Sequence, residues 1–112
     1  MFFNSKLYTG PENCQKPDHG MLIGDLLHVS MTKDGAFNAA RFTAKAHEDF
    51  NQANMIVDAL RRDLQTNIKV WSVGMHGETL LEGKLVKVET ISDIAENRLI
   101  DEISVTINIP IV

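Results

Sequence analysis

Hydrophobic residues recur at every third or fourth position through the middle of the chain. Such spacings place side chains on one face of an α-helix. The stripe predicts one long amphipathic helix from about Ala36 to Gln65, which would be roughly 45 Å long at 1.5 Å per residue. Its members are Ala39, Phe42, Ala46, Phe50, Ala53, Val57, Leu60 and Leu64.

Apolar and polar residues alternate on both sides of this predicted helix. The alternation from Met21 to Met31 predicts one strand, and the alternation after residue 67 predicts three more, over about 68–75, 79–91 and 103–111. A bulge near Gly83 would explain a change of phase in the second of these three. We therefore expect an α+β fold in the order β-α-β-β-β, with one long helix on an antiparallel sheet of four or five strands.

The first 20 residues have a different character. They contain two of the three prolines, together with Gly10 and Gly20. We expect an irregular N-terminal arm over residues 1–20, followed by a single domain over residues 21–112. The residues that could anchor this arm, on its own core or on a neighbouring subunit, are Phe2, Phe3, Leu7 and Tyr8.

The predicted sheet is apolar on both faces, although one helix covers only one of them. Trp71 and Val73 point away from Ile68 and Val70, so they need a second cover, either the arm or another subunit. The residues predicted to form such an interface are Trp71, Val73, Met75, Leu22, Leu26 and, on the outer side of the helix, Met55.

Composition narrows the classes of function. The net charge is −4, and the 11 Lys and Arg residues are scattered, which argues against a nucleic-acid partner. Cys14 is the only cysteine, so no intrachain disulfide can form, and a reducing cytoplasm fits best. No apolar run approaches the length of a membrane span, and the N-terminus does not read as a signal peptide. We expect a cytoplasmic protein without a cofactor or a membrane partner.

Two groups of polar residues could carry chemistry. His47, Glu48 and Asp49 are adjacent, but on the predicted helix they point in different directions, which favours a solvated face. Asp25 interrupts the apolar face of the first strand. Either a bulge at Gly24 turns Asp25 outward, or it bonds to a backbone amide or Arg41.

The functional alternative gives Asp25 a site of its own. In this reading Asp25 lines a cavity between helix and sheet and acts as a base or binds a ligand, with His28 and Asp49 nearby.

A metal site is a third hypothesis. Cys14, Asp18 and His19 are spaced like half of one, but no second pair of ligands is visible, so we predict no metal.

These observations support two hypotheses for function. The first is a non-enzymatic interaction or assembly protein, a homo-oligomer or the binder of a protein partner, of the size and style expected for a small structural protein of a phage or mobile element. It would use the second sheet face and the arm as contact surfaces. The second is a small-ligand-binding or acid-base enzyme domain, with a pocket formed by Asp25, His28 and Asp49.

Overall fold

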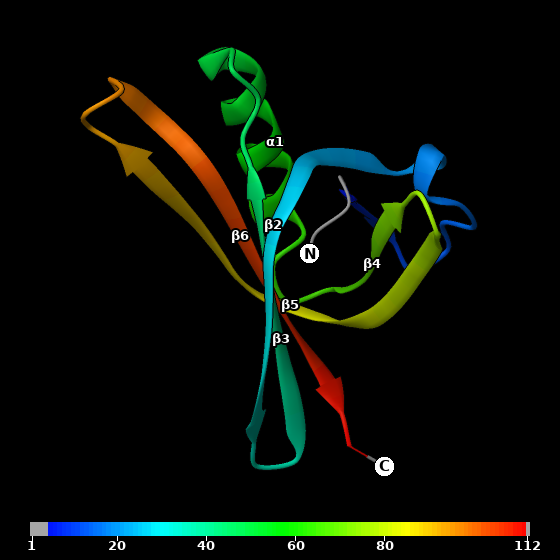
Figure 1. Cartoon of the computed structure of the whole chain (residues 1–112). Helices are drawn as coiled ribbons and strands as arrows, with labels where there is room; N and C mark the ends of the chain where they lie inside the picture. The colour runs from blue at the N-terminus through cyan, green and yellow to red at the C-terminus, as the bar shows by residue number, and fades with distance from the viewer. Residues whose placement is uncertain (1–4, 112) are drawn as a thin grey trace.

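The computed structural model describes residues 5–111 and shows one α-helix together with six antiparallel strands that close into a ring (Figure 1). Around the ring the strands follow the order β1-β2-β3-β6-β5-β4, and β4 closes back on β1. The elements are β1 (Lys6–Pro11), the 3-10 helix η1 (Pro17–His19), β2 (Met21–Asp34), β3 (Phe37–Lys45), α1 (Phe50–Arg62), β4 (Asn67–Gly74), β5 (Gly77–Asp93) and β6 (Arg98–Pro110). The α+β class is confirmed, whereas the predicted number and order of strands are wrong.

The largest correction concerns residues 36–49. The predicted helix over 36–65 is confirmed only over the 13 residues of α1, and residues 37–45 form β3. In β3, Ala40, Phe42 and Ala44 are buried at every second position and lie opposite apolar residues of β6. Alanine is compatible with the 3.6-residue period of a helix and with the two-residue period of a strand. Pairing with β2 and β6 therefore decides that residues 37–45 form a strand.

Helix α1 begins where a side chain caps it. Asp49 is the N-cap, and its Oδ1 accepts a hydrogen bond of 2.8 Å from the backbone N–H of Asn51. The helix buries Ala53, Val57 and Leu60 against β5 and β6, so it covers the inner face of the barrel at one end (Figure 1).

The N-terminal segment is not an irregular arm. Residues 6–11 form β1, which pairs with β2 on one side and β4 on the other, and Leu7 is fully buried in the core. Of the other predicted anchors, Tyr8 is half-buried, and Phe2 and Phe3 lie outside the described residues. The N-terminal segment is therefore part of the barrel wall.

Residues 12–20, which connect β1 to β2, lie over the outer face of the barrel. An added Cβ at Gly10 would lie 3.0 Å from Cys14 and 3.1 Å from the ring of Trp71, so the three residues are packed together. Lys69 Nζ donates to Cys14 O at 2.8 Å. Trp71 is only 2% exposed. The chain itself therefore covers Trp71, and of the two expected covers, the arm or another subunit, it is the N-terminal segment that lies there.

The predicted bulge near Gly83 lies slightly further along β5. Gly83 pairs regularly with Ile68, and the register shifts between Leu85 and Lys87. Gly83 is needed for close approach instead, since an added Cβ would lie 2.4 Å from the carbonyl oxygen of Asn108.

Two hairpins extend beyond the closed ring (Figure 1). β1 pairs with β2 only as far as Ser5 and Leu26, so within residues 5–111 the segment 27–34 pairs with β3 alone. Likewise β4 and its preceding turn reach only Leu85, so residues 86–93 of β5 pair with β6 alone. Among the described residues, each hairpin thus has one strand edge without a neighbouring strand, and we call residues 27–34 the distal β2 edge.

Candidate functional site

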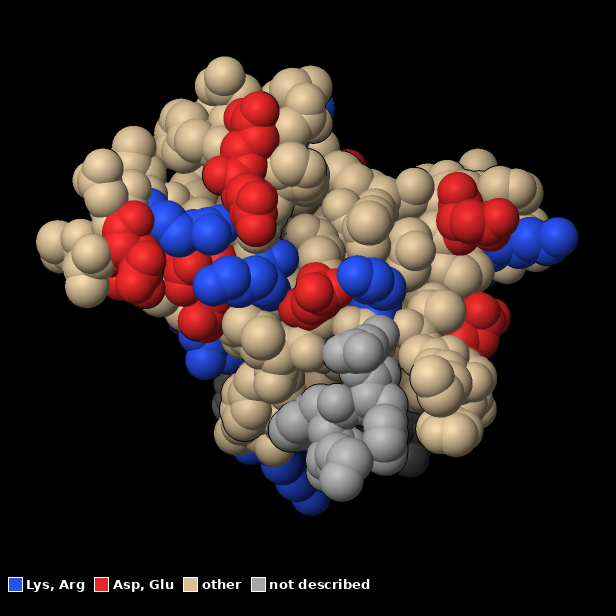
Figure 2. All heavy atoms as spheres, turned by 45° about the horizontal axis from the view of Figure 1, so that its top comes forward, with Lys and Arg blue, Asp and Glu red and all other residues tan. Residues whose placement is uncertain are grey.

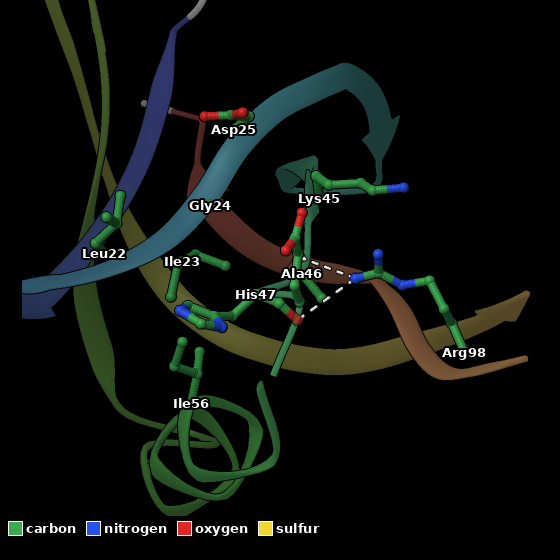
Figure 3. A pocket seen from close by; sticks show the side chains of 10 residues that line it. Leu22, Ile23, Gly24, Asp25, Lys45, Ala46, His47, Ile56 and Arg98 are labelled. Carbon is green, nitrogen blue, oxygen red and sulfur yellow. Dashed lines mark hydrogen bonds between the residues drawn. The ribbon is translucent and has the colours of Figure 1, made fainter. Parts of the chain in front are cut away.

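A pocket of about 330 Å³ lies where β2, the end of β3, the start of β6 and α1 meet (Figure 3). Ile23 and Ile56 supply apolar walls, and the remaining side chains are mostly charged. The charged and titratable lining residues are Asp25, Lys45, His47, Glu48 and Arg98. The position between helix and sheet matches the predicted pocket, although its residues match only in part.

The two cations of this pocket are held by a buried carboxylate. Lys45 Nζ lies 2.8 Å and Arg98 Nε 3.2 Å from Asp101 Oδ1, and the Asp101 side chain is 10% exposed. Arg98 also reaches the carbonyl oxygens of Ala46 and His47, each at 3.5 Å (Figure 3). These contacts hold the loop that follows β3 against β6. The network therefore lines the pocket and also orders the wall of the pocket.

This network was missed at the level of sequence. Asp101 continues the alternating stripe formed by Ile103 and Val105, so it occupies an inward position on β6. An acidic residue in an apolar stripe is the signal that singled out Asp25, and it could have identified Asp101 as well. Arg98 lies three residues before Asp101 on the same strand, whereas Lys45 lies at the end of β3, and only the fold brings it to Asp101.

Asp25 lines the pocket but points toward solvent. Gly24 has φ +155°, and the β1–β2 register shifts here, so the strand turns Asp25 out of the core to form an ion pair with Lys6. The outward alternative is thus the correct one. The proposed partner Arg41 instead lies 3.5 Å from Glu89.

His47, Glu48 and Asp49 lie in the loop before α1 and not on the helix. His47 Nδ1 accepts a hydrogen bond of 2.9 Å from the backbone N–H of Asp49. The proton of the neutral ring is therefore on Nε2. All three side chains are exposed, as predicted, but His47 and Glu48 line the pocket.

The other candidate residues are dispersed. Asp49 caps α1, and His28 lies exposed on the outer face of β2 opposite Thr43, so neither joins Asp25 in the pocket. Cys14 is buried and donates to the carbonyl oxygen of Lys16 at 3.2 Å. Asp18 and His19 are exposed on η1, and within residues 5–111 no three His, Cys, Asp or Glu side chains are grouped closely enough to hold a metal.

A second candidate surface is the apolar inner face of the β2–β3 hairpin. Met31 lies opposite Ala40, which in turn lies opposite Ile107, so the three share one face of the sheet. Ala40 and Ile107 are fully buried, whereas Met31 is 54% exposed. Two residues earlier on β2, Val29 is 41% exposed although it lies opposite buried Phe42. The core face of the barrel therefore continues to an exposed edge.

The residues predicted for an interface have different surroundings. Leu26 packs against the core, and Val73 is half-buried beside residues 16–18 in a second pocket of about 410 Å³. Leu22 is exposed on β2, Met55 on the helix and Met75 at the β4–β5 turn. The predicted set therefore does not form one continuous patch.

Charges of both signs are interleaved on the surface. In the described part of the face drawn in Figure 2, blue and red side chains alternate and no broad area has a single sign. This agrees with the scattered basic residues of the sequence.

Among the described residues, no helix is long and apolar enough to span a membrane.

The fold and surface define a small α+β barrel with one helix packed against it and an exposed apolar row on the β2–β3 hairpin. Comparison of the chain with protein-family models, with curated proteins and with solved structures finds no match.

Proposed function

We propose that this protein is a non-enzymatic assembly module that associates with further copies of itself through the β2–β3 hairpin. The observation that carries the proposal is the apolar row that runs from buried Ile107 and Ala40 to exposed Met31. Exposed residues that extend a core face are typical of surfaces that a partner covers.

The apolar side chains at this surface would supply part of the free energy of association. Complete burial of a Val or Met side chain contributes about 1.5–3 kcal/mol. Val29 and Met31 retain roughly half of their exposure, so each could contribute about 1 kcal/mol when covered. In a symmetric pair four such side chains are buried, and backbone hydrogen bonds along the strand edge add to this.

The test compares two exposed methionines. Met31→Lys places a charge at the proposed contact and should raise the dimer dissociation constant by about 10- to 100-fold, since 1.4 kcal/mol corresponds to a factor of ten. Met55→Lys changes a methionine on α1 that is 63% exposed and should leave the constant unchanged. Sedimentation equilibrium measures both. If Met55→Lys alone dissociates the protein, the helix face is the interface and the proposal is wrong.

The pocket supports a second proposal, the binding of a small polar ligand. It is favoured by the position of Asp25 beside Lys45, His47 and Arg98 around an apolar floor. Titration with acetate, phosphate and ethanolamine, followed by amide NMR shifts, should perturb the backbone of residues 45–48. Asp25→Asn should abolish the response to ethanolamine, whereas His28→Asn, outside the pocket, should retain it. No shifts at millimolar ligand would contradict this proposal.

The setting of such a module in a phage or mobile element stays a prediction, as does its cytoplasmic location.

A further inference from the structure

We infer that a pocket on the outer face of the sheet binds a small sugar acid, a single ring with several hydroxyl groups and one carboxylate. The pocket has a volume of about 290 Å³ and lies between the start of β3, the end of β6 and the middle of β5. It shares no lining residue with the pocket at Asp25. The inference therefore goes beyond both proposed functions and does not depend on either of them.

The register of the sheet places much of the polar lining in one row. Asn108 of β6 lies opposite Lys84 of β5, and Lys84 lies opposite Asn67 of β4. Residues that lie opposite each other project to the same face of a sheet. The neighbouring residue Ile107 is fully buried, so Asn108 belongs to the outer face. Three adjacent strands thus contribute polar side chains to one hollow.

Gln65 adds a further carboxamide from the segment after α1. It has φ +71°, the left-handed conformation in which many helices end. The backbone N–H of Gln65 donates to Leu85 O at 2.7 Å, and the N–H of Leu85 donates to Thr66 O at 2.9 Å. These bonds hold the segment against β5, so this wall of the pocket is ordered before a ligand binds.

The polar side chains of this pocket are available to a ligand. Within residues 5–111, no side-chain hydrogen bond or ion pair engages the four of them, which are Gln65, Asn67, Lys84 and Asn108. A carboxamide offers both donors and an acceptor, and so does a hydroxyl group. Three carboxamides around one pocket therefore match a ligand with several hydroxyl groups.

An apolar wall completes the pocket. Phe37 lies opposite Pro110, and both line the hollow. The Phe37 side chain is 43% exposed, so part of its surface is open to a ligand. The C–H groups on one face of a sugar ring form an apolar surface that can pack on such a wall while the hydroxyl groups reach the carboxamides. This combination favours a ring over an open chain.

The charges around the pocket select a monoanion. Among the described residues, Lys84 is the only charged residue that lines it. An adjoining pocket of about 190 Å³ shares Asn67 and Pro110 and is lined by Glu12 and Glu82. Lys84 attracts one carboxylate, whereas the two glutamates disfavour further negative charge nearby. A sugar acid with one carboxylate satisfies both conditions, and a phosphate ester or an acidic polysaccharide does not.

Three small ligands test these features separately. Glucuronate has the ring, the hydroxyl groups and the carboxylate, glucose lacks the carboxylate, and cyclohexanecarboxylate lacks the hydroxyl groups. Titration followed by amide NMR should show glucuronate shifting the signals of residues 65–67 and 84–86, with a dissociation constant on the order of 1 mM. The other two ligands should bind at least about threefold more weakly.

Matched variants locate the contacts. Lys84→Met should weaken glucuronate binding by about two- to fivefold, the change expected for an exposed ion pair, and leave glucose binding unchanged. Lys87→Met, on the same strand but outside the pocket, is its control. Asn67→Ala should weaken binding of both sugars, whereas Asn54→Ala, at an exposed position on α1, should weaken neither.

Each outcome decides the inference. A preference for glucuronate that is reduced in Lys84→Met and Asn67→Ala, and kept in both controls, supports it. Equal binding of glucose would show that the carboxylate is not recognised, and equal binding of cyclohexanecarboxylate would show the same for the hydroxyl groups. Either result overturns the inference, as would a native spectrum that none of the three ligands changes at tens of millimolar.

Discussion

At the scale of single residues, Gly24 decides what Asp25 can do. Its φ of +155° is a conformation that L side chains rarely adopt, and an added Cβ would lie 1.9 Å from the carbonyl oxygen of Lys45. Glycine therefore lets β2 approach the end of β3 and turn Asp25 to the rim of the pocket. The sequence raised this bulge as one alternative, but only the contact with Lys45 shows why glycine is required.

Gly24→Ala should lower the free energy of unfolding by more than the 1–3 kcal/mol or so that backbone strain alone costs, because a steric overlap is added. Gly77→Ala is the matched control. Its φ of +126° is also strained for alanine, but nothing lies within 4 Å of the added Cβ. Urea denaturation of both variants measures the difference, and equal losses would show that the contact with Lys45 is unimportant.

Asp101 is the second residue whose role depends on its surroundings. Asp101→Asn removes the charge that holds Lys45 and Arg98, and should destabilise the protein by about 1–3 kcal/mol. Asp25→Asn removes an exposed pair with Lys6 and should cost about 1 kcal/mol or less. Thermal denaturation compares them, and a larger loss at Asp25 would contradict the network described above.

At the scale of elements, the strands β4, β5 and β6 could be predicted, because their alternation of apolar and polar residues is typical of strands. The segment 36–49 could not. Its alanines fit a helix and a strand equally well, and its state depends on β2 and β6, which lie far away in the sequence. The role of β1 was missed because its proline and glycine residues read as turn chemistry, although Pro11 lies at the end of the strand.

The covering of Trp71 gives a prediction for residues 12–20. Trp71→Ala should lower the free energy of unfolding by about 3–5 kcal/mol, the usual cost of truncating a large buried side chain, without a separate effect on association. Leu22→Ala, at an exposed position on the outer face of β2, should cost much less. Chemical denaturation measures both. A Trp71→Ala chain of native stability that had lost only its oligomeric state would show that Trp71 lies at an interface after all.

At the scale of the whole molecule, the sequence indicated an excess of apolar surface but assigned it to the wrong place. The outer face around Trp71 is covered by the chain, whereas the inner face is exposed at Val29 and Met31. These two residues share the alternating stripe of buried Ile23, so the pattern alone does not distinguish them from core residues. Within residues 5–111, β1 pairs with β2 only as far as Leu26, and this determines which part of that stripe the described chain covers.

The most direct test of self-association is the mass of the native chain by light scattering over a concentration series at low and moderate salt. The account predicts a dimer, twice the 12.5 kDa of the chain, that persists at micromolar concentration and changes little with salt, because the contact is apolar. A strict monomer at every concentration would contradict it.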